Sequence, residues 1–507
     1  MITTPSRFQS AIFDHSRAIV EDGAPNLAVE AVAGSGKSST LIEICNRLPR
    51  GVRGTVVSFG ADVAEHMRKQ LPAGRGHQAL TAHALCRRAW LRRLGQQDIT
   101  VDKDKVRNML QDAVARGRLD PKATPPGQVR ALVDAARGRG LVPEGTPGMT
   151  GLVPDTDREW AGLIADLDIE AKDPAALVGA ARRALTVCIA QSGGVIDFND
   201  MLYMPILTDG TTFPRTDISM VDELQDLDPL QRRMVEMVGQ SSDGFIGAGD
   251  PLQAIFSWRG AGLDAMARVT QTMGCIELPL SVCYRCPTSH LNLAREYAPQ
   301  IEARLGAPEG LVEHHPSIDL GRFQPGDVVI CRMKAPGVDL AIRLIQAGIP
   351  TRVLGRDIAS SLEELVRSSG ATTVTELLVA AKRRCGKAQE RAEKLNNEEA
   401  LAEASDRLRI VQAIADTCDD DSLDTFVRRL RFLFAEEGGT AKVTICTIHK
   451  FKGMQAPRVW WLDEHLCDAE RCKSPMVAQE TRNLRYVALT RSTDELHFIY
   501  SRDNRDR

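Results

Sequence analysis

Short apolar runs rich in β-branched residues alternate with stretches of helical periodicity along much of this chain. In the first half these runs are Leu27–Ala31, Thr55–Phe59, Ile218–Val221, Gly244–Ala248 and Cys275–Leu278. In the second half they are Asp327–Cys331, Lys442–Ile448, Arg458–Leu462 and Glu495–Tyr500. Strands separated by helix-length segments are typical of parallel sheets covered by helices. The pattern therefore predicts α/β cores.

Two stretches of the chain lack such strands and show helical periodicity instead. The first is residues 84–191, and the second, which is highly charged, is residues 356–439. We therefore predict two parallel-sheet α/β cores, each interrupted by a mainly helical insertion. Residues 1–83 and 192–280 would form the first core, and residues 281–355 and 440–507 the second.

Composition narrows the class of protein. A length of 507 residues predicts about three or four domains, and 43% apolar with 26% charged residues is typical of a globular chain. The net charge of −3 excludes a globally basic, histone-like binder but leaves room for a local basic channel. We find no apolar run of the ~18 residues that a membrane span needs and no apolar signal segment. We therefore expect a cytoplasmic protein with no membrane partner.

A glycine-rich segment follows the first apolar run. Leu27–Ala31 leads into Val32-Ala-Gly-Ser-Gly-Lys-Ser38 and then into a helical pattern, although Ala31 stands where the strict motif has glycine. Backbone N–H groups of such a loop surround phosphate oxygens, and the helix N-terminus adds partial positive charge. Lys37 would contact the β- and γ-phosphates, and Ser38 would ligate Mg²⁺. The predicted loop residues are Gly34, Ser35, Gly36, Lys37, Ser38 and Ser39.

A pair of acidic residues follows another apolar run. Asp222 and Glu223 come directly after Ile218–Val221. A carboxylate at the end of a neighbouring strand can hold hydrated Mg²⁺, and a second can polarise the attacking water. We assign these roles to Asp222 and Glu223 respectively. Together with the glycine-rich loop, they predict a nucleoside triphosphatase that uses Mg²⁺.

Further segments resemble, in their order along the chain, the motifs of one helicase family. They are the segment around Gln9, then Thr81–Cys86, Ile196–Leu202, Val221–Asp226, Gly249–Ala261, Leu278–Arg285, Thr447–Gly453 and Glu480–Arg491. Together they resemble the UvrD/Rep/PcrA-like helicases of superfamily 1. The resemblance implies two RecA-like cores. It also implies an ATP-dependent enzyme that moves 3′→5′ on single-stranded DNA and unwinds duplex at single-strand/double-strand junctions.

The resemblance also implies residue roles at the nucleotide. Gln253 would link the γ-phosphate to the DNA site, and Arg285 and Arg491 would stabilise charge on the phosphates. The residues implied around the adenine and ribose are Gln9, Tyr284 and Gln455, the last in place of the family's glutamate.

For DNA the resemblance implies aromatic stacking and backbone contacts. Aromatic platforms hold single strands without sequence preference, at about 1–3 kcal/mol per stacked base. The implied DNA-binding residues are Phe59, His83, Phe256, Trp258, Arg259, His449 and Lys452. One departure is Gly60-Ala61-Asp62-Val63, which lacks the basic residue of the family and places that contact in doubt.

Alternative functions stay open at this point. The chain could be a DNA-stimulated ATPase subunit that works with a partner nuclease, as in antiphage defence, or with a replication or repair factor. It could also be an RNA helicase of the same superfamily. Cys283 with Cys286, and Cys467 with Cys472, could be taken for metal ligands. The second pair lacks zinc-finger spacing, and Tyr284 and Arg285 between the first pair are needed at the nucleotide.

Overall fold

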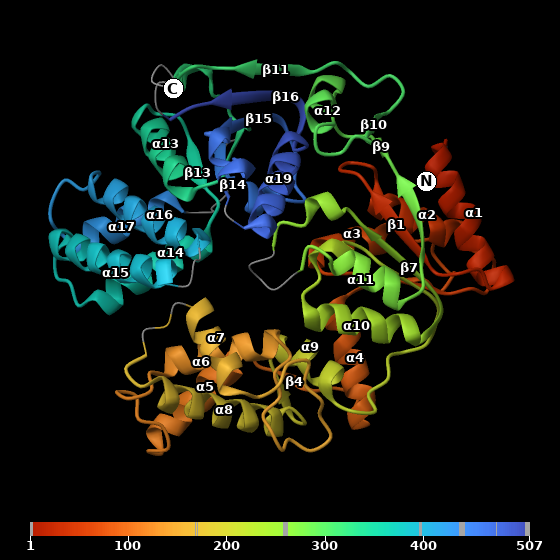
Figure 1. Ribbon diagram of the computed structural model, residues 1–507, viewed down its shortest axis with the longest axis horizontal. Coiled ribbons are helices and arrows are strands. Elements are labelled where there is room, and N and C mark those ends of the chain that lie inside the picture. The colour runs from red at the N-terminus through yellow and green to blue at the C-terminus, as the bar shows by residue number, and fades with distance from the viewer. Residues whose placement is uncertain are drawn as a thin grey trace. The chain divides into compact units, whose positions relative to one another are not determined.

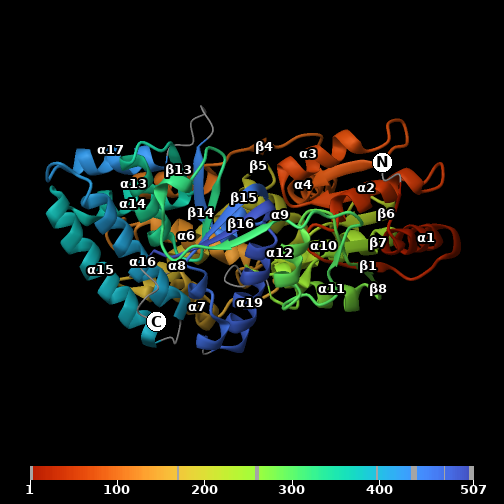
Figure 2. The same ribbon diagram turned by 90° about the horizontal axis from the view of Figure 1, so that it is seen from above.

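The computed structural model describes residues 4–167, 169, 171–256, 262–394, 398–434, 442–472 and 474–501 (Figures 1 and 2). The chain forms two compact units, Met1–Ser281 and Val282–Arg507. Each unit contains a six-stranded sheet, and the ladders between the described strands are parallel. The fold class predicted from the hydrophobic pattern, two parallel-sheet α/β cores of the RecA-like type, is confirmed.

The sheet of the first unit has the strand order β3-β2-β6-β7-β1-β8. Its strands are β1 (Leu27–Ala31), β2 (Gly54–Ser58), β3 (Gln78–Thr81), β6 (Thr216–Val221), β7 (Ser242–Gly249) and β8 (Ile276–Leu280). β1 lies inside the sheet, with Val29 in register with Ala248 on one side and Leu278 on the other. Because parallel strands share a direction, the segments that leave their carboxyl ends gather at one edge.

Helices cover both faces of this sheet because side chains alternate along each strand. In β1, Leu27, Val29 and Ala31 belong to one buried cluster, whereas Ala28 belongs to another. The first cluster also holds residues of α1 (Arg7–Asp22), α2 (Lys37–Arg47) and α3 (Ala61–Gln70). The second holds residues of α4 (Ala82–Leu94), α9 (Phe198–Leu207), α10 (Pro229–Gln240) and α11 (Ala265–Thr272). This two-sided burial explains the near-continuous apolar character of the central strands.

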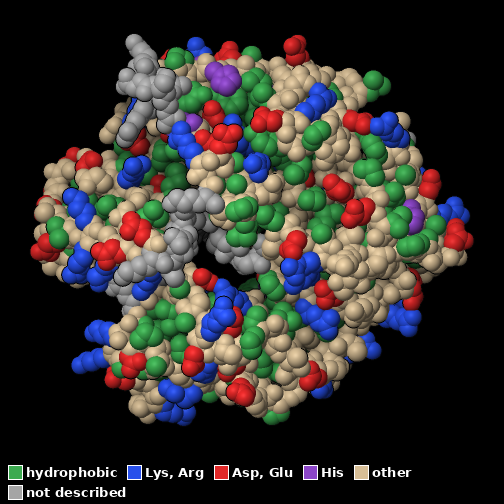
Figure 3. Space-filling view, in the orientation of Figure 1, with side chains coloured by type: hydrophobic (Ala, Val, Ile, Leu, Met, Phe, Trp, Pro, Cys, Tyr) green, Lys and Arg blue, Asp and Glu red, His purple; other side chains and the backbone are tan. Residues whose placement is uncertain are grey.

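The first insertion is helical. Its helices are α5 (Lys105–Ala115), α6 (Pro126–Gly138), α7 (Asp157–Asp166) and α8 (Pro174–Gln191). A two-stranded ladder, β4 (Thr100–Val101) with β5 (Val195–Ile196), closes it. On the face seen in Figure 3, Lys and Arg side chains are interspersed with Asp and Glu over these helices. This face of the insertion therefore presents mixed charge and not a broad basic surface.

A buried ionic cluster fastens the insertion to α9. Arg137 Nη1 donates to Asp197 Oδ1 and to Asp200 Oδ1, both at 2.8 Å. Lys105 Nζ donates to Asp200 Oδ2 at 2.6 Å. All four side chains are almost wholly buried, and charges in such a place are tolerated only when they pair with one another. The segment Ile196–Leu202 therefore contributes its two aspartates to structure.

The second unit has the strand order β11-β16-β15-β12-β14-β13. Its strands are β11 (Leu311–His314), β12 (Val328–Cys331), β13 (Thr351–Val353), β14 (Val443–Thr447), β15 (Ala456–Leu462) and β16 (Ser492–Ile499). A separate ladder joins β9 (Val282–Cys283) to β10 (Glu302–Ala303). The helices that accompany the sheet are α12 (Thr288–Ala294), α13 (Lys334–Gln346), α18 (Ile448–Phe451) and α19 (Pro475–Leu489).

The second insertion is a group of helices between β13 and β14 (Figure 1). They are α14 (Arg356–Ser369), α15 (Val374–Lys394), α16 (Glu398–Ala415) and α17 (Leu423–Leu433). Asp406 of α16 anchors the group, because its carboxylate accepts hydrogen bonds from the backbone N–H groups of Lys334 and Ala335 at 2.8 and 2.7 Å. These groups belong to the first turn of α13, where the helix dipole favours a negative charge.

Each apolar run singled out in the sequence forms a strand. The strands that the sequence analysis missed include β3, β11 and β13, which have only three or four residues each. Within the described part of the chain, no helix has both the length and the apolar character that a membrane span needs.

Candidate nucleotide site and nucleic-acid interface

The loop between β1 and α2 has the backbone shape of a phosphate cradle. Gly34 and Gly36 have φ values of 69° and 82°, a left-handed conformation that side chains with a Cβ adopt only with strain. Gly36 is the N-cap of α2, so the helix N-terminus opens onto this loop. Ser35 is buried, and its Oγ has no hydrogen-bond partner among the residues that the structure describes. A buried hydroxyl without a protein partner fits a loop that wraps around phosphate oxygens.

The two predicted magnesium ligands lie in contact. Ser38 Oγ, in the first turn of α2, donates to Asp222 Oδ2 at 2.6 Å, and Asp222 follows the carboxyl end of β6. Asp222 is 1% exposed, and burial together with the nearby Glu223 carboxylate raises its pKa to about 6. Lys37 and the Ser38 hydroxyl partly offset this increase. A hydroxyl and a carboxylate are the hard oxygen donors that Mg²⁺ prefers, so the pair fits a nucleotide–Mg²⁺ complex.

Glu223 lies beside the loop lysine. Lys37 Nζ is 3.7 Å from Glu223 Oε2, which also accepts a hydrogen bond from Gln225 Nε2. The backbone of Glu223 is left-handed, with φ of 60°, and such a conformation costs a non-glycine residue about 1–3 kcal/mol. The Glu223 side chain is 43% exposed, so water reaches the carboxylate. A held but hydrated carboxylate can accept a proton from a water molecule.

Gln253 belongs to the same polar group. It follows β7 in a short 3-10 turn, Pro251–Gln253, and its Nε2 donates to Asp250 Oδ2. The backbone N–H of Asp250 in turn donates to Gln225 Oε1 at 2.9 Å. Burial raises the pKa of Asp250 to about 6, and Lys37 lowers it in part. Hydrogen bonds therefore connect the segment after β7 to the segment after β6. They run from Gln253 to Asp250, then to Gln225 and finally to Glu223.

Gln9 contacts helix α2, which follows the glycine-rich loop, and Ser39 lies in this helix. Gln9 completes the capping box of α1, since its Oε1 accepts from the Ser6 N–H at 3.0 Å. Its Nε2 donates to Thr40 Oγ1 in α2 at 3.3 Å, which places this side chain against the helix that follows the glycine-rich loop. Ser39 is exposed on the same helix.

The predicted DNA-contacting residues of the first unit follow strands of its six-stranded sheet. Phe59 follows β2 and is half-buried against the core, and Phe256 is half-buried after the turn that holds Gln253. His83 lies in the first turn of α4, directly after β3, and burial lowers its pKa, so the ring is neutral near pH 7. Trp258 and Arg259 lie outside the described residues.

An aromatic residue that the sequence analysis did not assign lies beside His83. The Phe198 ring is 6.0 Å from the His83 ring, edge to face, and Phe198 is 58% exposed. Its neighbours Asp197 and Asp200 are buried in the ionic cluster, which fixes the start of α9. The sequence signal that could have identified Phe198 is an aromatic residue between two acidic residues, Asp197-Phe-Asn-Asp200. This segment was interpreted from the sequence only as a family motif.

In the second unit, the two predicted phosphate-contacting arginines meet at Thr490. Arg285 Nη1 donates to the Thr490 carbonyl at 3.2 Å, and Arg491 Nη2 donates to Thr490 Oγ1 at 3.1 Å. Arg491 is fully buried and also donates to the carbonyls of Val487 and Met454 at 2.9 and 3.3 Å. Tyr284, next to Arg285, is exposed.

The remaining predicted residues of the second unit follow β14. Thr447 caps the short helix α18 by accepting from the Lys450 N–H at 3.3 Å. His449 within this helix and Lys452 after it are half-buried, and Gln455 is exposed. His449 and Lys452 therefore lie at the carboxyl edge of the second sheet.

Two family comparisons cover most of the chain. Residues 14–274 match the family described as UvrD/REP helicase N-terminal domain, and residues 329–503 match the UvrD-like helicase C-terminal domain. The chain belongs to the UvrD-like helicase family. Members of this family are ATP-driven and generally use Mg²⁺.

Individual relatives resemble shorter parts of this UvrD-like chain. "RecBCD enzyme subunit RecB" of Mycolicibacterium smegmatis is 30% identical over 165 residues, 31% of this chain and 14% of that protein. "Probable DNA helicase II homolog" of Mycoplasma capricolum is 32% identical over 82 residues, 16% of this chain and 11% of that protein. The alignments thus span a small part of the length of these relatives.

Among solved structures, "Crystal structure of Arterivirus nonstructural protein 10 (helicase)" has a TM-score of 0.33 and 13% identity. The match covers 97% of this chain and 63% of the arterivirus chain, and similarity at this level supports no inference about function.

Gln225 and Asp250 were not assigned as site residues from the sequence of this UvrD-like helicase. Both occur in segments that resemble family motifs, Val221–Asp226 and Gly249–Ala261. Asp250 could have been found by the rule that identified Asp222, since it too follows an apolar strand directly. Gln225 offered no such signal, because its role depends on a contact with another strand.

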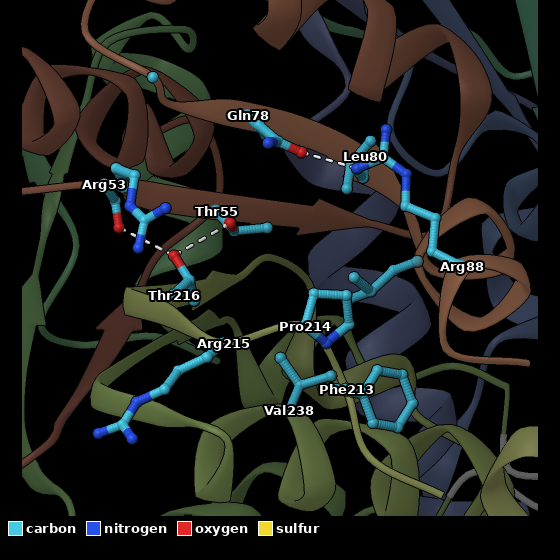
Figure 4. Close-up of a pocket in the computed structure, with 12 residues that line it drawn as sticks. Arg53, Thr55, Gln78, Leu80, Arg88, Phe213, Pro214, Arg215, Thr216 and Val238 are labelled. Carbon is cyan, nitrogen blue, oxygen red and sulfur yellow. Dashed lines mark hydrogen bonds between the residues drawn. The ribbon is translucent and has the colours of Figure 1, made fainter. Parts of the chain in front are cut away.

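A cavity in the first unit lies away from these residues. It has a volume of about 210 Å³ and lies near the amino ends of β2, β3 and β6, whereas the phosphate loop leaves the carboxyl end of β1 (Figure 4). Its arginines are already engaged: Arg88 with the Gln78 side chain, and Arg53 and Arg215 with carboxylates. Thr216 Oγ1 donates to the Arg53 carbonyl at 2.9 Å. We therefore assign no nucleotide contact to this cavity.

Proposed function

We propose that this chain is an ATP- and Mg²⁺-dependent motor that translocates 3′→5′ along single-stranded DNA and unwinds duplex. The observation that carries the proposal is the 2.6 Å contact between Ser38 and Asp222 beside the pair of Lys37 and Glu223. Family membership supports the DNA substrate, and the polarity rests on the motif resemblance alone. The domain limits expected from the sequence and a cytoplasmic location are part of the same proposal.

The site residues divide the chemistry of phosphoryl transfer among them. The loop N–H groups and Lys37 bind the β- and γ-phosphates of ATP, and Ser38 and Asp222 hold Mg²⁺. Bound Mg²⁺ would neutralise charge on the phosphate oxygens. Glu223 orients the attacking water and accepts its proton at the carboxylate, while Gln225 fixes the orientation of that carboxylate.

In this proposal, Gln253 reports the state of the γ-phosphate to a DNA-binding segment. It is hydrogen-bonded to Asp250, which contacts Gln225, and Phe256 follows three residues later. A shift of Gln253 upon hydrolysis would therefore move the backbone that carries Phe256. Gln253 and Phe256 are only three residues apart in the chain, and on this basis we propose that ATP hydrolysis is coupled to DNA binding.

Phe198, with His83 and Phe59, supplies a candidate platform for bases. A neutral imidazole and an exposed phenyl ring can stack or donate hydrogen bonds without reading sequence. The other contacts stay predictions of the resemblance: Tyr284, Arg285, Arg491, Gln455, Trp258, Arg259, His449 and Lys452.

Strand displacement on tailed duplexes tests the proposal. Matched partial duplexes carry either a 3′ or a 5′ single-stranded tail, and the reaction contains ATP and Mg²⁺ with Lys37→Ala as control. We expect displacement from the 3′-tailed substrate only. Displacement from the 5′-tailed substrate alone would contradict the polarity, and displacement by Lys37→Ala would contradict the nucleotide site. Replacing the tail with RNA of the same sequence separates a DNA motor from an RNA helicase.

A second candidate function is supported by one of the relatives. A protein named as a subunit of the RecBCD enzyme is 30% identical over 165 residues, and a subunit acts within a complex. In this reading the chain is a DNA-stimulated ATPase that works with a partner such as a nuclease or a replication or repair factor. Single-stranded DNA would then stimulate ATP hydrolysis, but neither tailed duplex would be unwound by the chain alone.

A further inference from the structure

A cluster of two histidines and a glutamate lies at the edge of the second sheet. Glu313 is in the edge strand β11, which lies beside β16 (Figure 1), and it is in register with His497 of β16. His315 follows β11, and its backbone N–H donates to the Phe498 carbonyl at 2.9 Å. The parallel pairing of these two strands thus brings together side chains that are far apart in sequence. The two imidazoles are nearly buried, and the carboxylate is partly exposed.

One ligand atom from each residue forms a compact triangle. His315 Nε2 is 3.2 Å from His497 Nδ1, and Glu313 Oε2 is 3.4 Å from the first and 3.6 Å from the second. Zinc bonds to nitrogen and oxygen of about 2.0–2.2 Å correspond to tetrahedral ligand–ligand separations of about 3.3–3.6 Å. The three observed separations are therefore close to one face of a zinc tetrahedron.

We propose that Glu313, His315 and His497 form a Zn²⁺ site whose fourth position is taken by water. The donor set of two imidazoles and one carboxylate is one that Zn²⁺ commonly uses, and these side chains also satisfy the three-ligand pattern of an open zinc site. The site is separate from the Mg²⁺ ligands Ser38 and Asp222, so it goes beyond the proposed motor function.

The surroundings of His497 match those of a histidine that binds metal. Its second nitrogen, Nε2, lies 3.0 Å from Glu495 Oε2, and Arg458 Nε donates to the same carboxylate oxygen at 2.7 Å. The Trp460 ring stacks on the imidazole with centroids 4.1 Å apart. Carboxylates that accept the free N–H of a ligating histidine fix its orientation and increase its basicity. Nδ1 of His497 is thereby directed at His315 and Glu313.

Arg322 opposes metal binding in the arrangement observed. Its Nη1 lies 3.2 Å from His315 Nδ1, so the guanidinium donates to that nitrogen and His315 carries its proton on Nε2. In that tautomer His315 Nε2–H donates to His497 Nδ1, and His497 Nε2–H donates to Glu495. Zinc needs the other tautomer of His315, with the proton on Nδ1. Arg322 is half-exposed and also lies 3.7 Å from Asp319, so it can turn toward that residue.

The proposed ion would fasten an edge strand. β11 has four residues and, among the strands that the structure describes, pairs in its sheet only with β16. A metal held by residues of β11, of the segment after it and of β16 would cross-link them. β16 starts immediately after Arg491, so the cross-link would stabilise the strand that follows the predicted phosphate-contacting arginine.

Metal titration of the full chain tests the site. Protein stripped with EDTA is titrated with Zn²⁺ against a chromophoric chelator, and with Co²⁺ as a spectroscopic probe. We expect one site that disappears in His315→Gln and in Glu313→Gln. His314→Gln is the matched control, because His314 is adjacent but exposed and outside the triangle, and it should bind as the unmodified chain does.

Two further variants separate a metal site from a purely hydrogen-bonded cluster. Glu495→Gln should weaken Zn²⁺ binding by about 10–100-fold, as loss of a carboxylate behind a ligating histidine does. Arg322→Ala should tighten it, because a competing cation is removed. If the unmodified chain binds no Zn²⁺, or if His315→Gln and Glu313→Gln bind it unchanged, the proposal is wrong. Intense near-ultraviolet thiolate bands from bound Co²⁺ would likewise assign the ion to cysteines and overturn it.

Discussion

Replacing Asp222 with asparagine should stabilise the nucleotide-free protein while removing a magnesium ligand. Asparagine has the same shape, its Oδ1 can accept from the Glu223 N–H as Asp222 does at 3.0 Å, and its amide can donate to Ser38 Oγ. The substitution therefore removes a buried charge while the side chain keeps its two hydrogen-bond partners, Ser38 and the Glu223 N–H. Binding sites commonly keep such costly charges for function.

The magnitude follows from the pKa of Asp222. Burial and Glu223 raise it from 3.8 to about 6. A difference of roughly two pH units, at about 1.36 kcal/mol each, means that ionised Asp222 costs about 3 kcal/mol at neutral pH. Because the folded pKa lies above the unfolded one, the cost grows as pH rises through that window and is complete above the folded pKa. It should fall to about half at pH 5 and nearly vanish below pH 4.

Thermal unfolding in EDTA measures this effect at pH 7.5 and pH 5. Asp222→Asn should raise the melting midpoint of the first unit by about 4–8 °C at pH 7.5 and by about half as much at pH 5. Asp217→Asn is the control: it lies on the same strand, is partly exposed and pairs with Arg53, so it should change stability by less than about 1 kcal/mol. A lower midpoint for Asp222→Asn at pH 7.5, or a gain that does not depend on pH, would refute the reasoning.

Three further substitutions test other parts of the structure. Lys37→Ala should abolish ATP hydrolysis and leave single-strand binding nearly unchanged, and full residual hydrolysis would remove the phosphate-loop assignment. Arg137→Met leaves buried Asp197 without its arginine and should lower the free energy of unfolding by about 3–5 kcal/mol in chemical denaturation. Arg139→Met, which breaks an exposed ion pair, should lower it by less than about 1 kcal/mol, and equal effects would contradict the buried cluster. Phe198→Ala should weaken single-stranded DNA binding by about 1–3 kcal/mol in fluorescence anisotropy, whereas replacing the similarly exposed Phe432 of α17 with alanine should not. An unchanged affinity for Phe198→Ala would show that Phe198 does not bind bases.

The sequence predicted the central strands well because burial on both faces makes them apolar throughout. β1 was predicted with the bounds that the structure shows. The β6 prediction starts two residues late and ends at the same residue, and the β7 prediction starts two residues late and ends one residue early. Edge strands such as β11 and β13 were missed because only part of their surface is buried. A short, half-exposed strand carries no continuous apolar run, and its pairing is decided by neighbours distant in sequence.

Four residues that we propose for the nucleotide site follow strands of the first unit that the sequence predicted. Lys37, Ser38, Asp222 and Glu223 need only the rule that parallel strands end at one edge. The contacts of Gln225 and the cluster of Glu313, His315 and His497 could not be predicted in this way. They depend on strand order and register, which local hydrophobic patterns do not specify. The exposure of Phe198 could not be predicted from the local sequence either. It depends on the burial of Asp197 and Asp200, which contact the distant residues Arg137 and Lys105.

The proposed nucleotide site should hydrolyse ATP under the control of single-stranded DNA. The test is to measure steady-state ATP hydrolysis with and without a single-stranded oligonucleotide, for the unmodified chain and for Glu223→Gln. ATP binding by both proteins is measured in parallel. The unmodified chain should be stimulated by DNA. Glu223→Gln should still bind ATP but hydrolyse it about 10²–10⁴-fold more slowly, because the proton acceptor is lost. Hydrolysis at the full rate by Glu223→Gln, or hydrolysis by the unmodified chain that ignores DNA, would contradict the account.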